Sequence, residues 1–214
     1  DTGVLLITGG IAGDLAQLQM IPGVGRVQQD DAVLGVQIPL HARQRLRGLA
    51  GAEIIVKGPS ADLHSGVFGG AVANPIAALA EIITSFHDED GRVAVRGFYD
   101  GVEPIATWER SMWATVPGMS NEELAKLTGV ETVVTGFTGA ECIFARPTLE
   151  INGIGGGYQG EGSKTIIPSH AFAKISCRLV PGQQPEKIET LLEEHVKSHA
   201  PRGVTVEFKR GHGG

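Results

Sequence analysis

The chain lacks several features that would point to large classes of protein. It contains only two cysteines, Cys142 and Cys177, too few for a disulfide framework. Cys177 alternates with Ile175 and Leu179 in a predicted strand, which favours a small buried side chain in a reducing compartment. No apolar run approaches the ~18–20 residues of a membrane span, and the first residues lack the layout of a signal peptide. We therefore expect a cytoplasmic protein with no membrane partner.

The chain also lacks an excess of basic residues over acidic ones. The net charge is −6 at pH 7, so the sequence has no electrostatic footprint for nucleic acid and we expect no such partner. Hydrophobic residues make up 42% and charged residues 20%, as in an ordinary globular protein. A length of 214 residues suffices for one sizeable core or two small ones.

No complete set of hydrolytic residues is present. The sequence has no G-x-S-x-G elbow, no cysteine beside a helpful histidine and no cluster of histidines and carboxylates at metal spacing. His195 and His199 share a helical face, but Val196 stands where a zinc peptidase has its glutamate. The glycine-rich run 160–168 resembles a phosphate loop only loosely. These absences favour an accessory domain over a self-sufficient enzyme.

The hydrophobic pattern predicts an α+β fold from about residue 50 onward. Strict alternation in 171–179 predicts a strand with Lys174, Ser176 and Arg178 on its polar face. The predicted order is strand, helix, insertion, two strands, helix and strand, at 53–57, 71–86, 92–147, 149–152, 171–179, 185–199 and 204–209. This split β-α-β order predicts a two-layer sandwich of the ferredoxin-like kind: an antiparallel sheet with two helices on one face.

The inserted segment and the first 50 residues show weaker hydrophobic patterns. In the inserted helical segment, helices are predicted near Thr107 and after the capping box at Ser120. In the first 50 residues, 4–7 could be a strand and 14–19 a short helix.

Two side chains are candidates for chemistry. His64 lies in the run 57–70, K-G-P-S-A-D-L-H-S-G-V-F-G-G, on a glycine-rich loop between a strand and a helix. Such a loop can place a titratable group at a surface or cleft, although a histidine that merely caps the helix remains the alternative. Arg178, on the polar face of its strand, could hold a carboxylate by two parallel hydrogen bonds, or could simply be solvated.

Five motifs in order carry a resemblance to a known family. They are 46–49 (L-R-G-L), 57–70, 146–153 (R-P-T-L-E-I-N-G), 162–168 (G-S-K-T-I-I-P) and 178–183 (R-L-V-P-G-Q). Together they resemble the lid, or dimerisation, domain of M20-family metallopeptidases, on the carnosinase-like dipeptidase branch. The resemblance implies a lid domain over 46–214 with an insertion at about 90–147. Residues 1–45 match poorly and would link it to a catalytic domain.

The resemblance also implies roles for four residues. His64 would reach into the partner subunit's active site and help to stabilise the oxyanion. Arg178 would hold the terminal carboxylate of the substrate, Thr165 would contact the substrate, and Asn152 is a weaker candidate for the same pocket.

The family's metal-binding and general-base motifs are absent from this sequence. The resemblance therefore implies two divalent metals, zinc or manganese, in the parent enzyme and none in this chain. We expect the substrate-binding lid of a homodimeric dipeptidase that hydrolyses short peptides with a free C-terminal carboxylate. The chain alone should be inactive without its catalytic domain. The alternatives are a stand-alone dimerisation or binding module, and the lid of a related M20 aminoacylase or carbamoyl hydrolase.

Overall fold

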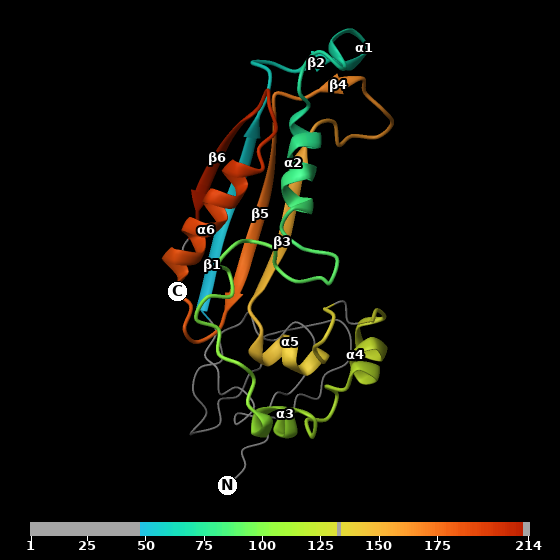
Figure 1. The fold of residues 1–214 in the computed structure, drawn as a ribbon. Coiled ribbons are helices and arrows are strands. Elements are labelled where there is room, and N and C mark those ends of the chain that lie inside the picture. Colours follow the sequence, from blue (N-terminus) through green and yellow to red (C-terminus); the bar gives the residue numbers. More distant parts are fainter. Residues whose placement is uncertain (1–47, 132–133, 212–214) are drawn as a thin grey trace, which may run out of the picture.

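A four-stranded antiparallel sheet organises the chain, for which a computed structural model describes residues 48–131 and 134–211 (Figure 1). Its strands follow the order β3-β5-β1-β6. They are β1 (Gly48–Lys57), β3 (Thr148–Gly156), β5 (His170–Leu179) and β6 (Thr205–Arg210). All three neighbouring pairs are antiparallel. The strand and helix considered for 4–7 and 14–19 lie outside the described residues.

Two helices cover one face of this sheet, α2 (Pro75–Thr84) and α6 (Pro185–Ser198). The alternating residues of β5 predicted to be apolar are all buried: Ala171, Ala173, Ile175, Cys177 and Leu179. They belong to one core with Leu79 of α2 and Leu192 of α6. The predicted α+β sandwich with both helices on one face is therefore confirmed, and the polar face of the sheet is left open.

Helix α2 begins later than its hydrophobic pattern suggested. Asn74 has an extended backbone, and its Oδ1 accepts a hydrogen bond from the backbone N–H of Ile76 (2.9 Å). Pro75 then occupies the first turn, where its missing N–H costs no hydrogen bond. A helix from residue 71 would place Asn74 in the α conformation, which a following proline disfavours.

The segment between α2 and β3 has its own hydrophobic cluster. It contains α3 (Thr107–Trp113), α4 (Asn121–Thr128) and α5 (Gly139–Ala145), packed around Trp113 and Phe144. Helix α4 starts with the capping box expected from the sequence, formed by Ser120 and Glu123. Helix α5 was not predicted, although Thr138 and Glu141 form an equivalent box.

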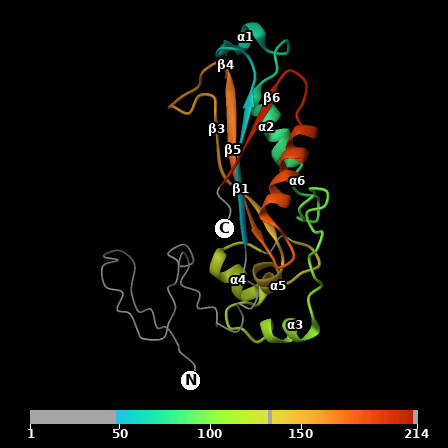
Figure 2. The ribbon, with the colours of Figure 1, turned by 90° about the vertical axis from the view of Figure 1, so that its left-hand side faces the viewer.

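Three very short elements lie at one end of the sheet, at the top of Figure 1. They are β2 (Leu63–His64), α1 (Ser65–Phe68) and β4 (Ile166–Ile167). Figure 2 shows from a second side that they project beyond the end of the sheet opposite the helical insertion. None of the described helices is both long and apolar enough to cross a bilayer.

Candidate functional site

The segment that bears His64 is held by backbone pairing to a distant part of the chain. Strand β2 pairs with β4, so that His64 lies opposite Ile166. The N–H of Ser65 donates to the carbonyl oxygen of Thr165 (3.1 Å), and the N–H of Gly58 donates to that of Ser169 (2.9 Å). We call residues 58–65 the His64 strap. Its backbone is thus fixed against 165–169 before any side chain is considered.

The two ring nitrogens of His64 have different partners. Nδ1 accepts a hydrogen bond from the backbone N–H of Gly66 (3.0 Å), which caps α1. Nε2 lies 3.1 Å from the hydroxyl oxygen of Thr165. Because a backbone amide only donates, Nδ1 must be unprotonated, and the neutral ring carries its proton on Nε2. The helix-capping alternative is therefore correct for Nδ1, while Nε2 of this exposed residue is a hydrogen-bond donor.

The imidazole of His64 leaves little room for a side chain at position 66. A Cβ at this position would lie 2.9 Å from Cε1 and 3.1 Å from Nδ1 of His64. The first of these distances is shorter than real Cβ atoms show, so a side chain here would push the ring away. The absence of a side chain at Gly66 thus allows the ring of His64 to occupy its observed position.

Arg178 lies near the opposite end of the sheet. It is exposed on the open face of β5, between Leu49 of β1 and Thr148 of β3. It follows His170, at the end nearest the His64 strap, by eight residues, which corresponds to about 26 Å along the strand. Figures 1 and 2 both show the strap and the Arg178 end of β5 at opposite ends. An extended dipeptide spans only about 7 Å, so it cannot touch both residues of one chain.

Asn152 lies between these two ends. It is the extra residue of a β-bulge, because the pairing shifts between Ile151 and Gly153, and it is exposed. Its place beside Lys174 puts it about 12 Å along the sheet from Arg178. Of the four predicted site residues, the structure therefore brings together His64 and Thr165, and it places Asn152 and Arg178 apart from them.

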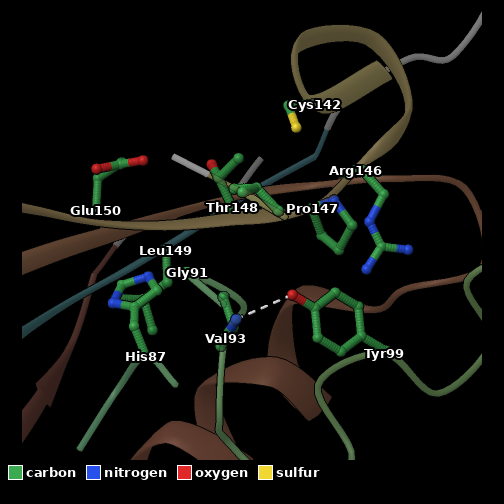
Figure 3. A pocket seen from close by; sticks show the side chains of 11 residues that line it. His87, Gly91, Val93, Tyr99, Cys142, Arg146, Pro147, Thr148, Leu149 and Glu150 are labelled. Atoms are coloured by element: carbon green, nitrogen blue, oxygen red, sulfur yellow. Dashed lines mark hydrogen bonds between the residues drawn. The ribbon is translucent and has the colours of Figure 1, made fainter. Parts of the chain in front are cut away.

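A cavity of about 270 Å³ contains none of the predicted site residues (Figure 3). It lies where α5 leads into β3 and is lined by His87, Tyr99 and Arg146, among others. The guanidinium of Arg146 lies 4.5 Å from the centre of the Tyr99 ring and 4.4 Å from that of Phe137. The sequence offered no signal for this cavity, because its walls come from separate elements.

The two other groups considered from the sequence are structural. His195 stacks on Phe86 and on His199, and its Nε2 lies 2.9 Å from the hydroxyl of Ser85. Burial, followed by the neighbouring His199, lowers the pKa of His195. Burial raises the pKa of Cys177 to about 12, as expected for a small core side chain. Within 48–131 and 134–211, no group of three or more histidines, cysteines or carboxylates could hold a metal ion.

Comparison with known proteins defines the class of this fold. The family described as "Peptidase dimerisation domain" matches residues 45–204. The "Cys-Gly metallodipeptidase DUG1" of Saccharomyces cerevisiae is 35% identical over 170 residues, covering 78% of this chain and 34% of the relative. The "Beta-Ala-His dipeptidase" of Rattus norvegicus is 34% identical over 156 residues, covering 71% of this chain and 31% of the relative.

Solved structures agree with the sequence matches. The yeast dipeptidase Dug1p superposes with a TM-score of 0.67 at 32% identity, over 79% of this chain and 36% of that one. Human carnosine dipeptidase 1 superposes with a TM-score of 0.68 at 28% identity, over 78% of this chain and 37% of that one. The chain belongs to the M20 peptidase dimerisation-domain family, as the five motifs indicated. It spans about a third of the length of these curated relatives.

Proposed function

We propose that this chain is the substrate-binding and dimerisation domain of a dipeptidase, and that His64 donates a hydrogen bond to the substrate. The observation that carries this proposal is the fixed tautomer of His64, with Nδ1 held by Gly66 and the Nε2 proton directed at the hydroxyl of Thr165, where both residues are exposed. The similarity to the yeast and rat dipeptidases supports the substrate class, a short peptide with a free C-terminal carboxylate.

The chemistry of His64 follows from its hydrogen bonds. When the peptide carbonyl is attacked, its oxygen gains negative charge, and a preorganised N–H donor stabilises that charge. The Nε2–H of His64 is such a donor. It lies within hydrogen-bond distance of the Thr165 hydroxyl, which is proposed to contact the substrate as well. Neither ring nitrogen is available as a general base in this arrangement, because Nδ1 already accepts and Nε2 already carries a proton.

Arg178 is proposed to bind the C-terminal carboxylate of the substrate. Its guanidinium is exposed on the open sheet face, and its planar fork suits two parallel hydrogen bonds to a carboxylate. Asn152, exposed at the bulge of β3, is proposed as a further substrate contact. Because the His170 end of β5, near which His64 lies, is about 26 Å along the strand from Arg178, His64 and Arg178 would reach one dipeptide only from two different protomers.

The edge of β3 is the proposed place of contact between protomers. The other edge, β6, bears Glu207 and Lys209, which form ion pairs with each other and with Lys57 and Glu53 of β1. Such charges discourage edge-to-edge pairing. On β3, Ile154 is 60% exposed and shares an apolar hollow with Ile76 of α2, which is 38% exposed. A second copy would cover this apolar edge and pair with its backbone groups.

The metal ions and the general base are proposed to come from the rest of a longer protein. The described residues do not fit a metal site, so no step is assigned to a metal in this chain. The yeast relative is named a metallodipeptidase, and zinc and manganese are the ions that the resemblance implies. The chain alone is then expected to be inactive toward dipeptides, and the whole enzyme to be cytoplasmic.

Subunit complementation of the full-length enzyme tests the proposal. His64→Ala and Arg178→Ala should each lose most dipeptidase activity, the second mainly through a higher KM. In co-assembled mixtures, half of the dimers are mixed and each has one intact site, so activity should return to about a quarter of wild type. Lys174→Ala, which removes another exposed cation from the same face of β5, is the matched control. Mixtures that recover nothing would refute the sharing of one site between protomers.

A further inference from the structure

Asp62 joins the His64 strap to the opposite segment through its side chain. Its Oδ1 accepts a hydrogen bond of 2.8 Å from the backbone N–H of Ser169, 107 positions away. The carbonyl oxygen of the same serine accepts from the N–H of Gly58. Ser169 is therefore bound on both of its backbone groups by the strap.

This contact matters because the pairing that it extends is very short. Strands β2 and β4 have two residues each, and isolated two-stranded pairs are marginal in water. Leu63 is half-buried and Ile167 is buried, which supplies some apolar cohesion. The hydrogen bond between Asp62 and Ser169 extends the β2–β4 pairing at the end away from His64. It therefore limits how far the His64 strap can move away from 165–169.

The carboxylate of Asp62 is ionised at neutral pH. The hydrogen bond from the backbone N–H of Ser169 is the main cause that lowers its pKa, and the nearby charges of Lys164 and His170 act in the same direction. Hydrogen bonds to an ionised acceptor are shorter and stronger than those between neutral groups.

We infer that Asp62 is a positioning residue, which holds the strap in the register that places His64 Nε2 against Thr165. The catalytic meaning of this inference rests on the proposed function, but the clamp itself is a property of this chain. Losing the acceptor should let the strap move away from 165–169, and His64 Nε2 would then lose its contact with Thr165, whereas the bond from Gly66 N–H to Nδ1 is local and should remain.

NMR spectroscopy of the 214-residue chain tests the clamp without a substrate. In Asp62→Ala, amide exchange of Ser65 and Ser169 should accelerate about tenfold, the change expected for loss of one hydrogen bond. The ¹⁵N shift of His64 Nε2 should change, because this nitrogen loses the Thr165 hydroxyl as its partner, while the shift of Nδ1 should stay. Asp62→Asn keeps an oxygen acceptor and should restore most of both signals. A role in stability alone would not be expected to change the Nε2 shift and to be rescued in this way.

Asp88→Ala is the matched control. Asp88 is another exposed carboxylate, and its Oδ1 accepts from the N–H groups of Asp90 and Arg92, away from the strap. This variant should leave the His64 shifts unchanged. Unchanged exchange and unchanged ring shifts in Asp62→Ala would overturn the inference, as would an Asp62→Asn variant as disturbed as the alanine variant. Because hydrolysis is not measured, this result is independent of the complementation experiment.

Discussion

Replacing Gly66 by alanine should move the imidazole of His64 without unfolding the protein. The new Cβ would lie 2.9 Å from Cε1, whereas ordinary contact begins at 3.4 Å, so the ring must withdraw by about half an ångström. The backbone at Gly66 is not left-handed, so alanine adds no backbone strain. A shift of about 1 Å can cost about a hundredfold in rate, and we expect kcat of the full-length enzyme to fall about tenfold.

Two measurements separate this effect from a loss of stability. The hydrogen bond from Gly66 N–H to Nδ1 should weaken, which changes the His64 ring ¹⁵N shifts in the isolated chain. The midpoint of urea unfolding should stay close to wild type. Gly70→Ala is the contrasting control, because Gly70 has φ +79° and a Cβ added there would meet no other atom within 4 Å. It should cost roughly 1–2 kcal/mol through backbone strain and leave the histidine shifts in place. Unchanged kcat and ring shifts in Gly66→Ala would refute the steric argument.

Three further predictions concern the core, the pH response and the proposed dimer. Leu192→Ala, in the buried stripe of α6, should lower the free energy of unfolding by about 2–5 kcal/mol in urea titrations. Because burial and His199 lower the pKa of His195, the unfolded chain takes up the proton first. Stability should therefore fall as the pH drops from 6.5 through the folded pKa, and His195→Gln should flatten that part of the profile. Ile154→Lys should yield monomers in sedimentation, whereas Thr205→Lys on the β6 edge should not; equal dimerisation of both would exclude the β3 edge.

Local rules explain why most of the fold was predictable. The alternation along β5, the apolar stripe of α6 and the capping box of α4 each depend on residues within a few positions of one another. Helix α5 was missed although it is as long as α3, because its apolar and small residues are those of a buried segment and show little periodicity. Strands β2 and β4 were also missed, because a strand of two residues is too short to show an alternating pattern. They pair only because the main sheet brings their two segments together.

The amino-acid sequence by itself determined which residues could carry chemistry: an imidazole among glycines, and a guanidinium on the polar side of a strand. It also determined the family, because five motifs stand in order. Only the tertiary structure decided how those residues are grouped. The contact of His64 with Thr165 joins positions 101 apart in the chain, and the length of β5 separates both from Arg178. Distances of this kind depend on which strands pair, and pairing joins segments that are far apart in the chain, so the pattern within one strand does not reveal its neighbour.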